Sequence, residues 1–402
     1  MDEPTQQIKI PAGFRFAGVH CGLKRNPNKE DISLIVCDNP ATAAGVYTTN
    51  KVFAAPVRRD RSRTPSDKIR AVITNSGNAN ACTGEQGEKD CAEMANIVAE
   101  QIGASADDVL VMSTGIIGVH LPMEKIRSGI AAATGQTGAE ASDFIAAARG
   151  ILTTDNGKKI ASRSVTIDGR TFQIAGMCKG AGMIAPNMAT MLGIVLTDAP
   201  LSVDQAQSVL SQVADETFNC IRVDGHMSTN DSLLLLASGA EGGETLTDAQ
   251  LDQLQVAMKE ACEEMARLIP ADGEGATHLI KIDVEGCASV DDAKKIAIEV
   301  ADSPLVKTAI TGGDPNWGRI VSAVGYAGVT FDPLKLELRL NDILLYQEGT
   351  PVQFDAKNVS QSIKGSFETH VQLTLFEGDA KARVWASDLT VEYVKFNADY
   401  ST

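Results

Sequence analysis

The sequence predicts a mixed α/β protein. Short runs of β-branched and apolar residues, bounded by turn residues, occur along the 402 residues and are typical of strands. Longer segments between them repeat apolar residues at helical spacing. In the final third, apolar and polar residues alternate, which indicates antiparallel strands with one buried face. The length, with 44% apolar composition, predicts two domains or two halves of one layered unit.

The acidic composition limits the partners. The formal net charge is -16, whereas nucleic acids and anionic membranes attract proteins with a basic face. We therefore expect neither as a partner, and small metabolites held by a few local cations remain open. The segment MDEPTQQIKIPAGF is acidic and has no apolar centre, and no apolar run is long enough to span a bilayer. We expect a cytoplasmic protein.

The cysteine and glycine patterns argue against several kinds of cofactor site. Eight cysteines are scattered without a CxxC motif, which predicts buried free thiols and neither disulfides nor a zinc site. The dinucleotide fingerprint GxGxxG is not supplied by KGAGM, the nearest match, because a proline follows soon after it. We expect no metal ion.

The elements expected in the first half begin with strands 31–37, 44–48 and 70–74. Arg58, Arg59, Arg61 and Arg63 alternate with other polar residues, which favours a solvated loop over an anion site. A Gly- and Asn-rich segment, 75–90, leads into a helix. The remaining elements expected in this half are a strand at 108–112, helices at 122–133 and 139–152, and strands at 163–167 and 171–177.

The second half is expected to begin with a buried strand at 191–196. Helices at 203–218 and 247–269, a third beginning at Val290, and strands at 233–237, 279–284, 336–340, 371–376, 382–386 and 391–394 follow. The polar loop 219–232 lacks the glycine and terminal glutamate of an EF-hand. Bracing of the backbone near a site is the better interpretation of this loop.

The segment MCKGAGMIAPNMATMLGIVLTD, 177–198, is the most informative in the chain. Its Lys179 stands beside a glycine-rich turn, which can direct backbone N–H groups at an anion. The proline and asparagine that follow make the approach to Thr190 irregular. Thr190 then immediately precedes the apolar run of the predicted strand.

Thr190 is compatible with two roles. It can be a β-branched strand former at the start of a buried strand. Alternatively, its hydroxyl attacks the Ala189 carbonyl, and hydrolysis of the resulting ester leaves a chain that begins at Thr190. The new α-amine, with a reference pKa of about 7.7–8.0, would then be a base tethered to the nucleophile. Cleavage would divide the chain into an α fragment, 1–189, and a β fragment, 190–402.

Several stretches resemble a known family. KGAGMIAPNMATML, NSGNANACTGEQG, DGEGAT and DPNWGR resemble the ornithine acetyltransferase family, the bifunctional glutamate N-acetyltransferases of arginine biosynthesis. The resemblance covers nearly the whole chain. It implies an α/β fold with facing sheets, in the layered α-β-β-α arrangement of the ornithine acetyltransferase and DmpA-like type, with mixed and antiparallel sheets. It also implies self-cleavage between Ala189 and Thr190, and a heterotetramer of two α and two β fragments.

The resemblance implies roles for individual residues. Thr190 would be the nucleophile, and Thr114 with Gly115 the oxyanion hole. The implied substrate contacts are Thr153 (with Thr154 as the alternative register), Lys179, Thr190, Glu274, Asn397 and Thr402. Trp317 and Arg319 are expected to brace the site, and His278 stands where the family pattern has a lysine.

The function that the resemblance implies is acetyl transfer in two steps. Thr190 Oγ takes the acetyl group from N2-acetyl-L-ornithine, and L-glutamate then accepts it. No cofactor is expected, and acetyl-CoA stays open as a second acetyl donor. The alternative is an N-terminal-nucleophile aminopeptidase or amidase, in which water replaces glutamate. A third hypothesis is a non-enzymatic relative whose loop never cleaves.

Overall fold

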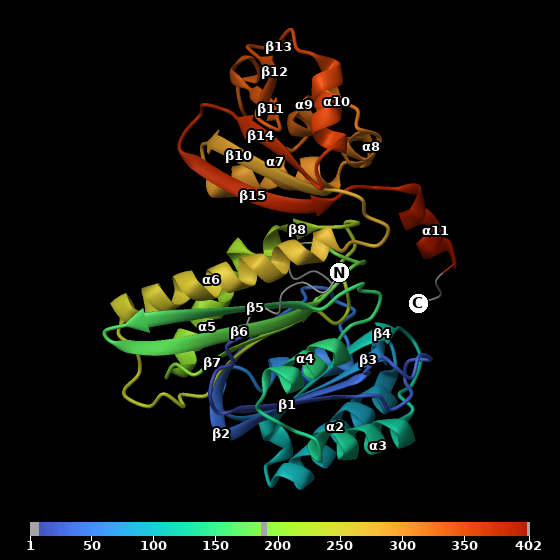
Figure 1. Cartoon of the computed structure of the whole chain (residues 1–402), viewed down its shortest axis with the longest axis vertical. Helices are drawn as coiled ribbons and strands as arrows, with labels where there is room; N and C mark the ends of the chain where they lie inside the picture. The colour runs from blue at the N-terminus through green and yellow to red at the C-terminus, as the bar shows by residue number, and fades with distance from the viewer. Residues whose placement is uncertain (1–7, 186–190, 400–402) are drawn as a thin grey trace.

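Two mixed sheets organise the computed structural model, which describes residues 8–185 and 191–399 (Figure 1). The larger sheet has eight strands in the order β4-β3-β2-β9-β7-β6-β5, with β1 also paired to β2. Its strands are β1 (Phe14–Val19), β2 (Ile32–Tyr47), β3 (Ser66–Asn78), β4 (Val109–Ile116), β5 (Lys159–Ile167), β6 (Arg170–Lys179), β7 (Leu192–Thr197) and β9 (Ser232–Ala237).

The long strand β2 allows this one sheet to form two facing layers. The first half of β2 pairs with β1 and β3, and its second half pairs with β9. The register with β3 breaks between Val36 and Ala41, around the exposed residues 38–40. The predicted strands 31–37 and 44–48 are therefore one strand. Residues 38–40 remain part of β2 because a sheet can bend at an irregular position and expose a few residues while β2 stays paired with β3 on either side.

One core lies between the two layers. Ile35 and Leu110 from the first half of the sheet share a buried cluster with Ile194 and Leu234 from the second half. Helix α4 (Ala141–Gly150) contributes to the same cluster and packs against β1 and β2. Side chains alternate across each strand, so the neighbouring residues of the same strands point to the outer faces.

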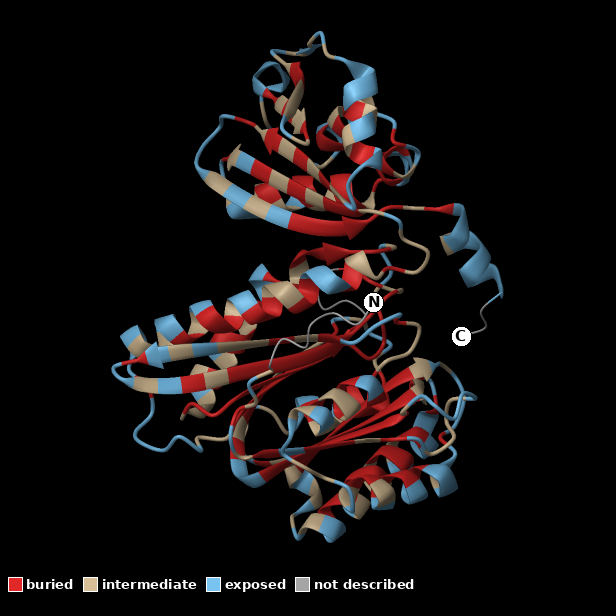
Figure 2. Cartoon of the chain, in the orientation of Figure 1, coloured by how far each residue is buried: buried red, intermediate tan, exposed pale blue. Residues whose placement is uncertain are grey.

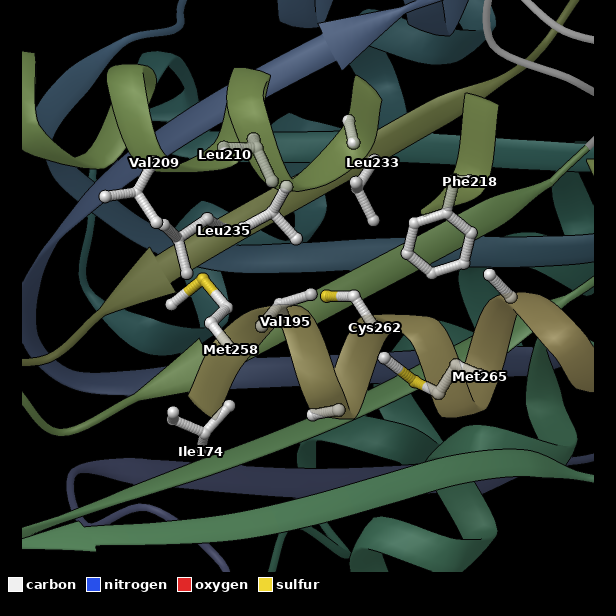
Figure 3. Close-up of a cluster of buried hydrophobic side chains, with 14 of the residues drawn as sticks. Ile174, Val195, Val209, Leu210, Phe218, Leu233, Leu235, Met258, Cys262 and Met265 are labelled. Carbon is white, nitrogen blue, oxygen red and sulfur yellow. The ribbon is translucent and has the colours of Figure 1, made fainter. Parts of the chain in front are cut away.

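Helices cover both outer faces and complete an α-β-β-α arrangement (Figure 1). Helices α2 (Gly84–Ile102) and α3 (Met123–Thr134) pack on the half formed by β1–β4. Helices α5 (Val203–Glu216) and α6 (Asp248–Ala271) pack on the other half. Figure 3 shows Val195 and Leu235 beside Met258 in one buried cluster, and Figure 2 shows both buried and exposed residues along α2, α3 and α6. The layered fold predicted for the chain is confirmed.

The smaller sheet has seven strands in the order β13-β12-β11-β14-β10-β15-β8. They are β8 (Ile221–Arg222), β10 (Leu279–Cys287), β11 (Glu337–Leu340), β12 (Ile343–Gln347), β13 (Thr350–Pro351), β14 (Glu368–Thr374) and β15 (Ala380–Ser387). Its own core also includes side chains from helices α7 (Val290–Asp302), α8 (Pro304–Gly312), α9 (Trp317–Gly325) and α10 (Ala356–Lys364). Strand β8 comes from the chain between α5 and β9, so the two sheets are joined by more than one crossing of the chain.

Three expectations about local structure were wrong. The smaller sheet is not purely antiparallel, because β10 pairs parallel with β14 and β15 parallel with β8. The alternation of apolar and polar residues indicates that one face of a strand is buried. It does not indicate whether neighbouring strands run parallel or antiparallel. Residues 391–394 belong to helix α11 (Val391–Asp399), in which no residue is buried. A four-residue alternation is too short to distinguish a strand from an exposed helical turn.

The third error concerns the arginine segment, which forms most of helix α1 (Ala55–Arg61). A proline in its first turn favours a helix start. Arg61 donates a hydrogen bond to the Thr48 carbonyl oxygen at 2.7 Å, and Arg63 forms an ion pair with Asp107 at 2.6 Å. These arginines tie neighbouring segments together.

The eight cysteines are free thiols, of which six are buried, Cys21 is half-buried and Cys82 is exposed. The prediction of free thiols is confirmed. The prediction that they are buried is confirmed for six of them, but not for Cys21 or Cys82. Among the helices of the described ranges, none has both the length and the apolar character needed to cross a bilayer.

Candidate functional site

A cleft opens where strand ends of the two layers come together. Thr114 and Gly115 reach it from β4, and Lys179 reaches it from the last position of β6. The lining residues are Ala79, Thr114, Gly115, Ile117, Thr153, Thr154, Lys179, Gly182, Met183, Ser228, Thr229, Asn230, Glu274 and Asn397. The cleft thus brings together predicted residues from separate motifs. Ala189, Thr190 and Thr402, which were also predicted, lie outside the described residues.

The end of β4 supplies a hydroxyl and a strained glycine. Gly115 has a φ of +133°, and a Cβ there would lie 2.3 Å from the Gly77 carbonyl carbon on β3. A side chain at this position is excluded, which leaves the backbone open to the cleft. Thr114 is 5% exposed, and its Oγ1 accepts a hydrogen bond from Lys179 Nζ at 3.3 Å. The Thr114 hydroxyl proton can therefore point at a third group.

Lys179 is a buried cation that faces several charged groups. Lys179 is only 3% exposed. Burial lowers the pKa of the Lys179 ammonium below its usual value, and attraction by the Asp155 carboxylate only partly offsets this effect. A lysine in this state can give up a proton more readily than one in water, or it can pair with an anionic ligand at the cleft.

Asp155 fixes the two segments that carry Thr153 and Lys179. Its carboxylate accepts hydrogen bonds from the Thr153 N–H at 3.0 Å and the Gly180 N–H at 2.7 Å. It also pairs with Lys159 at 2.6 Å, and Lys159 pairs in turn with Asp272 at 2.6 Å. Burial alone would raise the pKa of Asp155, but Lys159 and Lys179 outweigh it and hold this pKa well below its usual range. The pattern TTD followed by a lysine four residues later is the sequence signal for this pair, which was missed.

Glu274 and Asn397 meet at the mouth of the cleft. The Glu274 N–H donates to the Ala181 carbonyl oxygen at 2.9 Å, which ties the DGEGAT turn to the segment after β6. Asn397 Nδ2 donates to Glu274 Oε2 at 3.0 Å. The Glu274 carboxylate lies over Gly182, where a Cβ would come within 2.5 Å of it. The arrangement displays one carboxylate toward the cleft, as the sequence predicted.

The polar loop between α5 and β9 braces the site, as predicted. Asp224 accepts hydrogen bonds from the backbone N–H groups of Met183 at 2.6 Å and Ile184 at 2.8 Å. Asn230 Nδ2 donates to the carbonyl oxygens of Ala79 at 2.6 Å and Ser113 at 2.8 Å. The loop therefore holds the end of β4 in place. Ser228, Thr229 and Asn230 also line the cleft, which the sequence did not single out.

Two other predicted neighbours lie elsewhere. Trp317 stacks on Tyr346 of β12 with ring centroids 5.6 Å apart, and it packs against the core of the smaller sheet. Arg319 donates to the Leu305 carbonyl oxygen at 2.9 Å. Neither residue is among those that line the cleft, and their bracing of the site stays a prediction. Their motif begins helix α9, with Asn316 as its N-cap. His278 Nδ1 lies 3.2 Å from Asp388 Oδ2, and His278 does not line the cleft either.

The chemistry of the cleft suits a small zwitterionic ligand with an acyl group. Glu274 can meet an ammonium, Lys179 can meet a carboxylate, and Thr114 with the Gly115 N–H can donate to a developing oxyanion. Within the described ranges, no group of three or more His, Cys, Asp or Glu side chains is arranged to hold a metal ion.

Comparisons with known proteins agree with one another. The model of the ArgJ family matches residues 15–402. The arginine biosynthesis bifunctional protein ArgJ of Rhodopirellula baltica is 50% identical, over 100% of this chain and 98% of that protein. The protein of the same name from Geobacter sulfurreducens is 47% identical, over 97% and 99%. A crystal structure of ArgJ from Bacillus halodurans is 37% identical and covers 50% of this chain and 96% of that chain, with a TM-score of 0.49. The chain belongs to the ArgJ family.

Proposed function

We propose that this protein is a glutamate N-acetyltransferase of arginine biosynthesis, which moves an acetyl group from N2-acetyl-L-ornithine to L-glutamate. The observation that carries the proposal is the convergence of Thr114, Gly115, Lys179 and Glu274 on one cleft. The register of the neighbouring described strands supports Thr190 as the proposed nucleophile. Lys179, the last residue of β6, pairs with Leu192, the first residue of β7. The described chain therefore enters β7 beside the cleft, and Thr190 precedes Leu192 by two positions in the sequence.

In the proposed reaction, self-cleavage between Ala189 and Thr190 first produces an α fragment, 1–189, and a β fragment, 190–402. The new Thr190 amine then takes the hydroxyl proton as Thr190 Oγ attacks the acetyl carbonyl carbon. Thr114 and the Gly115 N–H stabilise the oxyanion, and each such donor is typically worth about 2.7–4 kcal/mol of barrier. Ornithine leaves with a proton from the amine. The glutamate amine then attacks the carbonyl carbon of the acetyl-Thr190 ester and gives a proton to the Thr190 amine. The bond to Thr190 Oγ breaks, Oγ takes that proton, and N-acetylglutamate leaves.

Substrate selection follows from the charges of the cleft. Glu274 would hold a substrate ammonium and Lys179 a substrate carboxylate, with Thr153, Asn397 and Thr402 as further contacts. Both substrates carry an α-carboxylate, and N2-acetylornithine also carries a side-chain ammonium. One site can therefore accept them in turn, as a two-step transfer requires.

Three further points belong to this proposal. No cofactor is needed, and acetyl-CoA is a second acetyl donor to be tested, because the relatives are named bifunctional. Two α and two β fragments would form the working assembly, which native mass measurement can test. The free thiols fit a reducing compartment, so we place the enzyme in the cytoplasm.

Mass spectrometry of the purified protein tests the central claim. We expect two fragments that meet between Ala189 and Thr190, and an acetyl adduct of about 42 Da on the second fragment after a pulse of N2-acetylornithine. Thr190→Ala should give one uncut chain without activity, and Thr171→Ala, at an exposed strand position, should behave as wild type. Normal turnover by Thr190→Ala would refute the proposal.

The amidase alternative is tested by the fate of the acetyl group. Family membership favours transfer, and release of free acetate at the same rate with and without glutamate would favour hydrolysis instead. A burst of ornithine followed by glutamate-dependent turnover is the result expected for the transferase.

A further inference from the structure

The two groups that meet at the mouth of the cleft come from chain segments that pair with each other in the smaller sheet. Glu274 lies in the turn before β10, and Asn397 lies in α11, which follows β15 (Figure 1). The start of β10 pairs antiparallel with the end of β15, at Leu279 and Ser387. From this pair, the chain leads in one direction to Glu274 and in the other to Asn397.

Asp388, the residue after β15, binds the base of the turn that carries Glu274. Asp388 is 4% exposed. Its Oδ1 accepts a hydrogen bond from the Thr277 N–H at 2.9 Å, and its Oδ2 accepts one from Thr277 Oγ1 at 2.6 Å. The Asp388 N–H donates to the His278 carbonyl oxygen at 3.1 Å. Both carboxylate oxygens and the backbone of Asp388 therefore fix the end of the turn.

Helix α8 holds the same segment in place. Lys307, a residue 4% exposed, donates from Nζ to the carbonyl oxygen of Ser387 at 2.5 Å. Thr311 Oγ1 lies 3.0 Å from Asp388 Oδ2 and 2.9 Å from the Leu389 carbonyl oxygen, and it can donate to either. The backbone around Asp388 is therefore anchored to the smaller sheet and its helices.

The residues after Asp388 connect this anchor to α11. Thr390 Oγ1 donates to the Gly275 carbonyl oxygen at 2.7 Å and accepts from the Tyr393 N–H, in the first turn of the helix, at 3.2 Å. Gly275 has a φ of +69°, and a Cβ there would lie 2.5 Å from the Tyr393 nitrogen. Every residue of α11 is exposed or half-buried. Polar contacts at its start therefore matter for its position, because core packing contributes little.

We propose, on the basis of the function proposed above, that Asp388 is the positioning residue for the ammonium-binding side of the cleft. It holds the Glu274 turn and the start of α11 in one arrangement, in which Asn397 can donate to the Glu274 carboxylate. Asp388 is not among the described residues that line the cleft, so it acts through Glu274. A side-chain ammonium of the substrate then meets a carboxylate whose orientation is already set, which lowers the cost of binding.

Asp224 is the other carboxylate that contacts α11. It accepts a hydrogen bond from the Tyr393 hydroxyl at 3.3 Å and binds the backbone N–H groups of Met183 and Ile184. Asp224 thus joins α11 to the segment after β6. Asp388 differs from it because its hydrogen bonds reach the Glu274 turn itself, through Thr277.

Calorimetric titration of the purified full-length protein tests the inference. L-ornithine and L-norvaline are matched probes, because they differ only in the side-chain ammonium. Asp388→Asn keeps the size of the side chain but replaces one acceptor oxygen with an amide that donates. We expect the Kd for ornithine to rise about tenfold and the Kd for norvaline to stay within about twofold. A merely structural role would change the thermal unfolding temperature without changing the ratio of the two Kd values.

Asp283→Asn is the matched control. Asp283 lies on β10, and its carboxylate also binds side chains of neighbouring strands, with Arg383 Nε at 2.6 Å and His370 Nε2 at 2.8 Å. It is not among the described residues that line the cleft. We expect both Kd values of this variant to equal those of the wild type.

Two substitutions of Thr277 keep the inference testable if Asp388→Asn does not fold. Thr277 is exposed, so the loss of its hydroxyl leaves the core intact. Thr277→Val removes the hydrogen bond to Asp388 Oδ2, and we expect the Kd for ornithine to rise about fivefold. Thr277→Ser keeps the hydroxyl and should restore the wild-type Kd.

The outcomes separate this inference from the proposed function. A wild-type Kd for ornithine in folded Asp388→Asn, or an equal rise for ornithine and norvaline, would overturn the inference. If Asp388→Asn does not fold, a wild-type Kd in Thr277→Val would overturn it equally, and so would a wild-type protein that does not bind ornithine. A wild-type protein that binds ornithine but transfers no acetyl group to glutamate would instead refute the proposed function.

Discussion

Asn397 and Glu274 are hydrogen-bonded across the mouth of the cleft, where Asn397 Nδ2 donates to Glu274 Oε2 at 3.0 Å. Asn397 comes from the exposed helix α11, whereas Glu274 lies in a turn anchored by its N–H to Ala181. The contact gives the carboxylate one orientation before any ligand arrives. Preorganisation of this kind reduces the ordering cost of binding.

Loss of this contact should weaken substrate binding. Asn397→Ala removes one hydrogen bond to a charged group at a solvent-exposed position, so we expect a cost of about 1 kcal/mol, or a rise in KM of about fivefold. Lys395→Ala changes the same helix at a residue that pairs only locally, with Glu392, and should leave KM unchanged. Steady-state kinetics with N2-acetylornithine checks both variants. Equal KM values would show that the contact has no role in binding.

Gly182 should be required for the position of the Glu274 carboxylate. In Gly182→Ala, the new Cβ would lie 2.5–2.7 Å from the carboxylate atoms, and the flexible side chain must move aside. We expect KM to rise about tenfold, within the usual cost of about 1–3 kcal/mol for overpacking, with the thermal unfolding temperature little changed. Gly157→Ala is the control because nothing lies within 4 Å of its Cβ. A wild-type KM for Gly182→Ala would contradict the assigned orientation.

Thr114 should act in the transition state and not in ground-state binding. Thr114→Val keeps the shape and removes the hydroxyl, so we expect kcat to fall about 10²- to 10³-fold with a small change in KM. Thr74→Val on the adjacent strand β3 is the control, since its buried Oγ1 has no hydrogen-bond partner within the described residues. That variant should have normal kcat. A large KM effect for Thr114→Val would assign Thr114 to binding instead.

Asp155 should be essential for stability. Asp155→Asn leaves the buried Lys159 with one partner fewer, and breaking a buried ion pair typically costs about 3–5 kcal/mol. Lys159→Met combined with Asp155→Asn should recover part of that loss, because the buried Lys159 ammonium is removed together with its partner. Urea denaturation of the two single variants and the double variant measures the coupling. Additive losses would show that the pair acts as two independent residues.

The same pair predicts a dependence of stability on pH. The pKa of Asp155 in the folded protein lies below its unfolded value of about 3.9. Its contribution is therefore fully present above about pH 4 and is lost as the pH falls toward the folded pKa. The difference in unfolding free energy between wild type and Asp155→Asn should shrink below about pH 4. A difference that stays constant down to the acid transition would contradict the depressed pKa.

Much of the fold and the chemistry could be read from local pattern. The buried strand after Thr190, the amphipathic helices α2, α5 and α6, and the glycine turn at Glu274 all follow from residue spacing and turn chemistry, which act over a few residues. The motif resemblance added Thr114 and Gly115 at the end of β4. The sequence pattern did not predict two short helices, α1, which has Pro56 in its first turn, and α11.

The sequence alone determined the candidate side chains for the proposed chemistry, because a hydroxyl, a cation and a carboxylate are properties of residue types in their local turns. Only the tertiary structure decided how they meet. The bend in β2 folds one sheet onto itself and brings the ends of β4 and β6 to the same cleft. Asp155 gained its role in the same way. Its carboxyl stays ionised because Lys159 and Lys179 lie beside it, and these two lysines come from separate strands.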